Sequence, residues 1–380
     1  MKHRRIASNL LLHRGKFLRN PLVEVDAEGV IRSVTSYDPT QIDRLEATEH
    51  YAGVMCAGFV NAHCHLELSY LRNKIAEGGG FATFASQIGR VRTLASDQER
   101  LEAIKEADAE LTAAGVVATG DIVNGTTSYA TKSCSTIEYR NFAEIFGLNT
   151  HDTQSVEPLL SLPNTSLTQH STYSLNDTIF RHVAGQATPN APLSIHFMES
   201  EHEQLLFERQ GSLHEWYERA GFECDFLHYG SPAQRIVSCI DASQPVILVH
   251  CCMVHQEDID LIMSHFTAPV YWVVSPRSNH YISRLTPPIE LLRRNSLNIC
   301  VGTDSLASNH SLSILEELRM FPEVPLAERL DWATRQGAAA LQMEHRGTIE
   351  VGKRPGINII SALDYPTMGI SQQTHIQRII

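Results

Sequence analysis

The most informative stretch of this sequence is Gly58-Phe-Val-Asn-Ala-His-Cys-His65, in which a short apolar run leads into two histidines one residue apart. In an extended strand, residues i and i+2 point to the same face, so the imidazoles of His63 and His65 can reach one divalent cation. Histidine pairs of this kind are also common as ordinary surface or core residues. The rest of the sequence has to decide between these two interpretations.

The composition is that of a soluble globular enzyme. The 380 residues are 43% hydrophobic and 19% charged, which excludes a disordered or fibrous chain. The net charge of -12 argues against a nucleic-acid partner, although a pocket can still hold an anionic small molecule. The sequence has no apolar run long enough to span a membrane, no convincing signal peptide and no disulfide framework. We therefore expect a cytoplasmic protein with no membrane partner.

Short β-rich runs alternate with longer helical runs between residues 57 and 346, which is typical of βα units and a parallel sheet. The expected strands are Ala57-His63, Val116-Val123, Phe142-Gly147, Ser166-His170, Leu193-Phe197, Val246-His250, Val270-Ser275 and Asn298-Asp304. Eight such strands close an α/β fold of the (β/α)8 TIM-barrel type. Residues 1–56 and 347–380 contain short β-runs and turns, so we expect both chain ends to form one small β-sandwich-like domain beside a catalytic barrel of residues 57–346.

Ionisable residues stand at the ends of five of these expected strands. Active sites of such barrels are built at the carboxyl ends of the strands. The residues found there are His63, His65, His170, His196, His250 and Asp304. Each one alone could be a hydrogen-bonded histidine or a helix-capping aspartate, but their convergence on one rim favours a site.

Three neutral imidazoles and one carboxylate suit one divalent ion, with Zn²⁺ favoured and Fe²⁺ or Mn²⁺ as alternatives. Such an ion lowers the pKa of a bound water towards about 7 and so supplies hydroxide at neutral pH. Glu199 lies three residues beyond His196, just after the expected fifth strand. Its carboxylate could reach the same cavity as a proton shuttle.

Several segments together resemble the amidohydrolase superfamily over nearly the whole chain. They are Gly58-Phe-Val-Asn-Ala-His-Cys-His-Leu-Glu-Leu, His196-Phe-Met-Glu199, Val301-Gly-Thr-Asp-Ser305 and Gly352-Lys-Arg-Pro. Within that superfamily, the sequence is most similar to the branch of cytosine, guanine, S-adenosylhomocysteine and aminodeoxyfutalosine deaminases and the triazine hydrolases. The proteins grouped with the aminodeoxyfutalosine deaminases look most similar.

The resemblance implies a role for each rim residue. The metal ligands would be His63, His65, His196 and Asp304. Glu199 would protonate a heterocycle, His250 would orient the attacking water, and His170 would contact the substrate. We expect His250 and Asp304 to help deprotonate that water. Binuclear relatives use a carboxylated lysine on a mid-barrel strand, and none of the six lysines here ends an expected strand, so we expect one metal ion.

The expected activity is hydrolytic deamination of an aminated, purine-like heterocycle or nucleoside of the adenosine type, with aminodeoxyfutalosine among the candidates. Arg140 is a candidate contact for a carboxylate on such a substrate, and an exposed arginine beside a strand is the alternative. Hydrolysis of an amide or a chloro-heterocycle at the same metal, and a metal-binding protein without turnover, remain rival interpretations. A homodimer is compatible with this fold. The Gly78-Gly79-Gly80 run is either a lid hinge or an ordinary turn.

Overall fold

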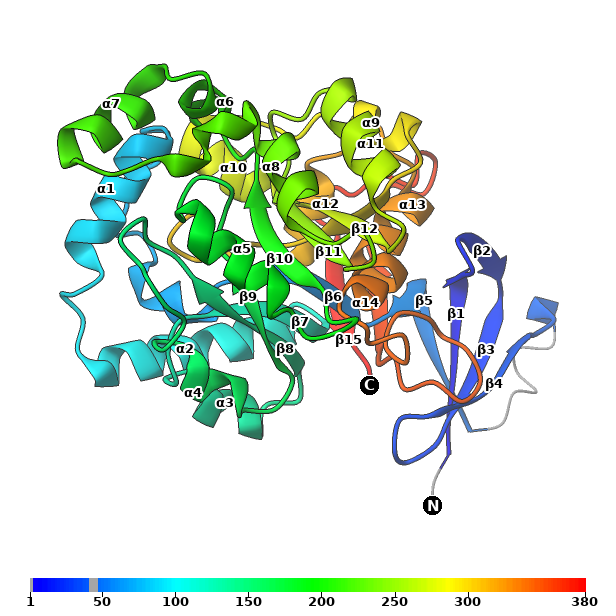
Figure 1. Cartoon of the computed structure of the whole chain (residues 1–380). Coiled ribbons are helices and arrows are strands. Elements are labelled where there is room, and N and C mark those ends of the chain that lie inside the picture. The colour runs from blue at the N-terminus through cyan, green and yellow to red at the C-terminus, as the bar shows by residue number, and fades with distance from the viewer. Residues whose placement is uncertain (1–2, 41–46) are drawn as a thin grey trace.

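The structure is a computed structural model that describes residues 3–40 and 47–380. A barrel of alternating strands and helices forms the larger part, and a small sheet lies beside it (Figure 1). The barrel strands are β6 (Phe59–Cys64), β7 (Val116–Val123), β8 (Glu138–Ile145), β9 (Thr165–Gln169), β10 (Leu193–Phe197), β11 (Val246–His250), β12 (Val270–Val274) and β13 (Asn298–Val301). All eight strands expected from the sequence are present, which confirms the predicted fold class.

The barrel is built from two four-stranded parallel sheets, β6-β7-β8-β9 and β10-β11-β12-β13. Parallel bridges join the sheets on both sides, from Ser171 to His196 and from Cys64 to Asp304. The backbone N–H groups of Thr303 and Asp304 both donate to the carbonyl of His63, each at 3.1 Å. The first and last strands of the barrel therefore meet at the residues expected to bind metal.

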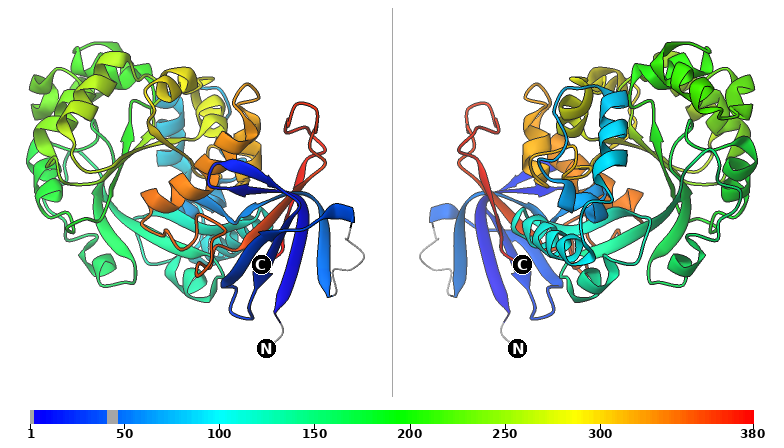
Figure 2. Two further views of the ribbon diagram at one scale, coloured as in Figure 1. Left: turned by 90° about the vertical axis from the view of Figure 1, so that its right-hand side faces the viewer. Right: turned by 90° about the vertical axis from the view of Figure 1, so that its left-hand side faces the viewer.

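Helices cover the outside of the barrel (Figures 1 and 2). Their bounds are α1 Phe81–Val91, α2 Asp97–Ala113, α3 Tyr129–Cys134, α4 Glu157–Leu160, α5 Asp177–Gly185, α6 Glu201–Phe207, α7 Gly211–Ala220, α8 Pro232–Cys239, α9 Gln256–His265, α10 Pro276–Ser283, α11 Ile289–Arg294, α12 Ile314–Arg319, α13 Leu326–Asp331 and α14 Gly337–Ala340. Further helical turns are η2 Leu66–Leu71, η3 Asp225–Tyr229 and η4 Trp332–Gln336. A capping box of Ser96 and Glu99 begins α2, whose Ile104, Ala107 and Leu111 pack into the core.

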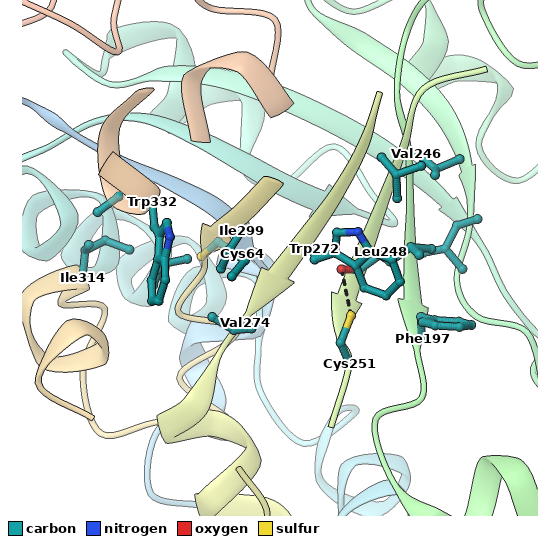
Figure 3. Close-up of a cluster of buried hydrophobic side chains, with 14 of the residues drawn as sticks. Cys64, Phe197, Val246, Leu248, Cys251, Trp272, Val274, Ile299, Ile314 and Trp332 are labelled. Atoms are coloured by element: carbon teal, nitrogen blue, oxygen red, sulfur yellow. Dashed lines mark hydrogen bonds between the residues drawn. The ribbon is translucent and has the colours of Figure 1, made fainter. Parts of the chain in front are cut away.

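Side chains alternate along the barrel strands between the interior and the surrounding helices. On β11, Val246 and Leu248 belong to the outer core, whereas Ile247 and Val249 pack inside the barrel. Figure 3 shows the outer core around Trp272, where the thiol of Cys251 donates to the carbonyl of Leu248 at 3.3 Å. Apolar packing on both faces holds the strands rigidly beneath the rim.

Both chain ends build the small sheet, which lies to one side of the barrel (Figure 2). Its strands are β1 (Arg4–His13), β2 (Lys16–Arg19), β3 (Pro21–Val25), β4 (Ile31–Ser36), β5 (Thr48–Ala57), β14 (Ile357–Ser361) and β15 (His375–Arg378). They form one mixed sheet in which β14 of the C-terminal end pairs antiparallel with β5. The expected domain limits at residues 56 and 347 remain a prediction.

Across the described ranges, 3–40 and 47–380, no helix combines the length and the apolar character needed to span a membrane.

Gly302 permits the close approach of β13 to β6. A Cβ atom at this position would lie 2.8 Å from the Cβ of His63 and 2.9 Å from its carbonyl oxygen. We expect Gly302→Ala to destabilise the fold by about 1–3 kcal/mol, because the His63 backbone would have to move within a packed barrel. Thermal unfolding measures this change.

The matched control is Gly89→Ala on α1, where a Cβ would meet no atom within 4 Å. Alanine should stabilise this helix slightly. Equal unfolding midpoints for the wild-type protein and Gly302→Ala would contradict the steric account of barrel closure.

Candidate active site

Five of the sequence-predicted residues converge at the carboxyl-terminal rim of the barrel. His63 lies on β6, His196 on β10 and His250 ends β11. His65 directly follows β6, and Asp304 follows β13. All are buried except His65, which is partly exposed. The topology thus brings together side chains that lie up to 241 positions apart in the sequence.

The predicted metal ligands lie within a few ångströms of one another. Nε2 of His65 is 3.1 Å from Nε2 of His196. Oδ1 of Asp304 is 3.7 Å from Nε2 of His63 and 3.6 Å from Nε2 of His65. Imidazole nitrogens and one carboxylate oxygen are a donor set that suits a divalent transition metal.

The state of the histidines fits a metal ion. Neither ring nitrogen of the buried His63 has a hydrogen-bond partner among the described residues. Nδ1 of His196 lies 2.8 Å from the carbonyl of His170 and donates to it, which leaves Nε2 with its lone pair free. Burial, and then the neighbouring His63, lowers the pKa of His65 to about 3. A neutral imidazole is the form that binds a cation, so this cluster can hold one.

Two serines fix the carboxylate of Asp304. The hydroxyls of Ser278 and Ser308 donate to its Oδ2 at 2.6 and 2.7 Å. Oδ1 therefore remains available on the side of the imidazoles. Hydrogen bonds of this kind orient a metal ligand and hold it in place.

Glu199 and His250 form the second part of the site. Nε2 of His250 is 3.8 Å from Oε1 of Glu199. Burial, and then the charges of Asp304 and Glu203, raises the pKa of Glu199 well above its ordinary value. Burial also lowers the pKa of His250 to about 4. Both groups are therefore neutral at neutral pH, and the carboxyl group of Glu199 can donate a proton.

Asn279 fixes the proton on His250. Its side-chain N–H donates to Nδ1 of His250 at 3.0 Å. In a neutral imidazole whose Nδ1 accepts, the proton must reside on Nε2. The Nε2–H of His250 consequently points towards Glu199 and the site.

A cavity of about 360 Å³ opens above these residues. His65, His170, His196, Glu199, His250 and Asp304 line its floor. Its walls are mainly apolar. The apolar and aromatic residues are Leu68, Phe81, Phe84, Ala85, Ile88, Phe146, Leu148, Tyr173, Leu213, Trp216, Tyr217 and Phe222, and Gly147, Ser174 and Ser305 complete the lining. Helices α1 and α7 provide many of these side chains and lie close together at one end of the barrel (Figure 1). The volume is within the range of small-molecule sites.

His170 faces this cavity, as a substrate contact would have to do. Its ring stacks on that of His196 with the centroids 4.6 Å apart, and its Nδ1 lies 2.9 Å from the hydroxyl oxygen of Ser174. Arg140 is not among the cavity-lining residues. It is the third residue of β8, far from the carboxyl end of that strand. Its role as a carboxylate contact finds no support in this arrangement.

The sequence reasoning missed Glu144, which stands near the end of β8. Its Oε1 is 3.8 Å from Nδ1 of His196, and with His170 and His196 it forms another group that could hold a metal ion. Burial raises its pKa to about 8, so this carboxyl is largely neutral. The rule that located the histidines looks for a polar residue at a strand's carboxyl end, and it passed over Glu144 because the expected third strand ran on to Gly147. The observed strand ends at Ile145 and so places Glu144 at the rim. No comparable sequence pattern marks the residues of α1 and α7 that form the apolar walls.

Comparisons with known proteins agree with this architecture. Residues 54–379 match the amidohydrolase family. An adenosine deaminase of Helicobacter pylori is 28% identical over 346 residues, which cover 83% of this chain and 80% of that protein. A 5-methylthioadenosine/S-adenosylhomocysteine deaminase of Caldanaerobacter subterraneus is 31% identical over 175 residues, which cover 39% of this chain. That match spans only 40% of the length of the deaminase.

Two solved structures share the fold. Helicobacter pylori aminofutalosine deaminase in complex with methylthio-coformycin superposes with a TM-score of 0.81 at 24% identity, covering 95% of this chain and 93% of the other. A zinc-bound adenosine deaminase of Xanthomonas campestris gives a TM-score of 0.74 at 21% identity, covering 96% and 85%. Because the family match extends over most of the chain, from the small sheet through the whole barrel, this protein belongs to the amidohydrolase family.

Proposed function

We propose that this enzyme deaminates a 6-aminopurine nucleoside that carries an apolar substituent. The observation that carries the proposal is the position of Glu199, a buried carboxyl group on the cavity floor, 3.8 Å from His250 and beside the candidate metal ligands. Deamination of an aromatic ring requires a proton on the ring nitrogen, which is what a neutral carboxyl can supply. Displacement of a good leaving group such as chloride needs less proton assistance.

We infer that the enzyme uses one divalent ion, Zn²⁺ most readily, held by His63, His65, His196 and Asp304. Such an ion would act as a Lewis acid and lower the pKa of water to about 7. The set contains imidazoles and a carboxylate, which also suits Fe²⁺ or Mn²⁺. Lys132, a buried lysine, pairs with Asp121 at 2.5 Å instead of joining the ligands, in keeping with a single ion.

The reaction adds the oxygen of water to the amine-bearing carbon, breaks the bond from that carbon to nitrogen and releases ammonia. Glu199 first donates its proton to the adjacent ring nitrogen. The carboxylate that results accepts a proton from the attacking water and passes it to the leaving amine. When the bond from carbon to nitrogen breaks, the remaining proton on the added oxygen moves to Glu199, which leaves a carbonyl group on the product and restores the carboxyl group. The Nε2–H of His250 holds the attacking oxygen in line with the carbon, and Asp304 offers Oδ1 as an acceptor for the water.

The cavity walls support a nucleoside with an apolar substituent. Aromatic and aliphatic side chains of α1 and α7 line the cavity, and its lining within the described residues includes no lysine or arginine. An apolar group gains free energy there, whereas a carboxylate would lose its water without gaining a cation. A methylthio group also appears in the names of a relative's substrate and of a neighbour's ligand. We therefore place 5′-methylthioadenosine ahead of aminodeoxyfutalosine.

The first test measures ammonia release by the zinc-loaded enzyme and its Glu199→Gln variant. The substrates are adenosine, 5′-methylthioadenosine, S-adenosylhomocysteine, aminodeoxyfutalosine, guanine and cytosine. Glutamine keeps the shape of the side chain but cannot transfer the proton, so we expect kcat to fall by about 10²–10⁴-fold. Metal content, measured in the same samples, should not change.

The control is Glu201→Gln, which alters an exposed carboxylate two residues further along and should leave ammonia release unchanged. A Glu199→Gln variant with most of the wild-type activity would refute the proton-transfer role. Deamination would be refuted if the wild-type enzyme released no ammonia from any of these substrates but released chloride or a carboxylic acid from others.

A second test concerns the substituent. Trp216 on α7 lines the cavity but is 49% exposed, so its removal should not disturb the core. We expect Trp216→Ala to lower kcat/KM for 5′-methylthioadenosine by about 10-fold, because an aromatic wall is lost. Adenosine, which lacks the substituent, is the matched control substrate and should respond less than 3-fold. An equal decrease of kcat/KM for both substrates would show that Trp216 does not contribute to recognition of the substituent.

A further inference from the structure

Glu203 is a buried carboxyl group that does not line the cavity. It lies in the first turn of α6 and is 1% exposed. No lysine or arginine among the described residues pairs with it. A carboxyl group that is buried without a cationic partner is costly unless hydrogen bonds compensate for the burial. The partners it does have are informative.

One oxygen of Glu203 binds the turn that carries Glu199. Its Oε2 accepts the backbone N–H of Glu199 at 3.3 Å, and the backbone of Met198 also donates to this carboxylate. Met198 has a positive φ of 49°, a conformation that side-chain-bearing residues seldom adopt. Such a conformation persists only where its surroundings hold it. Glu203 is one of those restraints.

The other oxygen of Glu203 binds the next loop along the rim. The hydroxyl of Thr172 donates to Oε1, and the carbonyl of Thr172 accepts from Nη1 of the buried Arg235 at 2.6 Å. Thr172 stands between His170 and Tyr173, which both line the cavity. Glu203 therefore connects the loop that carries His170 with the turn that carries Glu199.

We propose that Glu203 is a positioning residue, which sets the proton-transferring group Glu199 relative to the substrate-facing loop 170–173. This inference rests on the proposed deaminase function. The simpler alternative is that Glu203 only caps α6. A capping glutamate at this position bonds to the backbone N–H of the residue that precedes the helix, here Ser200. The bonds of Glu203 instead reach Met198 and Glu199 upstream and Thr172 on another strand's loop.

The test compares Glu203→Ala, Glu203→Gln and Thr172→Val with the wild-type enzyme, all loaded with zinc. For Glu203→Ala, we expect kcat to fall by about 10–100-fold while KM changes by less than about 3-fold, because Glu199 is misplaced but the cavity walls remain. Glu203→Gln should recover most of this loss. Its amide oxygen can accept from the Glu199 backbone, and its NH₂ group can donate to Thr172.

Thr172→Val keeps the shape of the side chain and removes one of the two links, so its loss of kcat should lie between those of the two Glu203 variants. Glu201→Ala, an exposed glutamate in the same turn, is the control and should behave as wild type. A wild-type kcat in Glu203→Ala, with only a lower unfolding midpoint, would overturn the proposal. If Glu203→Ala does not fold, wild-type kinetics in Thr172→Val would overturn the link between the loops.

Crystal structures of the wild type and Glu203→Ala separate this proposal from the proposed function. We expect the turn 198–200 and the side chain of Glu199 to move in the variant while α6 stays in place. If the wild-type enzyme released no ammonia, the proposed function would fail, and the displacement would still show whether Glu203 positions Glu199. An unchanged turn with Met198 still at positive φ would refute the positioning role.

Discussion

The barrel closes through a backbone contact between its first and last strands, and the candidate metal site depends on that contact. The carbonyl of His63 accepts two N–H groups from the segment that ends in Asp304. This places a carboxylate from one end of the barrel sequence against two imidazoles from the other. Gly302 makes the approach possible because it has no Cβ atom to clash with His63. Barrel stability and ligand geometry are therefore two consequences of the same contact.

Burial favours the neutral form of five ionisable groups in and beside the site. It lowers the pKa values of His65, His170 and His250 and raises those of Glu144 and Glu199. Neutral imidazoles are free to bind a cation, and a neutral carboxyl is free to donate a proton. One physical cause thus prepares both halves of the proposed chemistry. Asp304 has to be ionised to bind a cation. The hydroxyl groups of Ser278 and Ser308 donate to its Oδ2 and so stabilise the charged carboxylate.

Much of this arrangement could be predicted from the sequence, because strand ends determine it. The limits predicted for β7, β10 and β11 coincide with those observed. Since parallel strands end at one rim, the histidines could be brought together without any structure. His250 shows where such reasoning reaches its limit. Regular alternation along the strand would point the side chain of His250 outwards, like that of Leu248. Instead, the backbone of His250 has a positive φ of 79°, and its side chain lies at the rim.

Other features depend on how loops and helices pack, which local patterns do not encode. Arg140 was expected just before the third strand, near its start, but β8 begins at Glu138 and therefore includes it. The serines beside Asp304 come from the segments after β12 and β13. The cavity walls come from α1 and α7, whose apolar faces would be read from sequence as ordinary core contacts. Substrate preference is consequently the part of the function for which the structure adds most to what the sequence predicts.

We expect one ion to bind at the rim of the barrel, between the carboxyl ends of the first, fifth and eighth barrel strands. Anomalous diffraction at the zinc absorption edge, from crystals of the zinc-loaded protein, tests this expectation most directly. We expect one peak, about 2.0–2.2 Å from nitrogens of His63, His65 and His196 and from an oxygen of Asp304. Two peaks, or a single peak held by Glu144, His170 and His196, would contradict it.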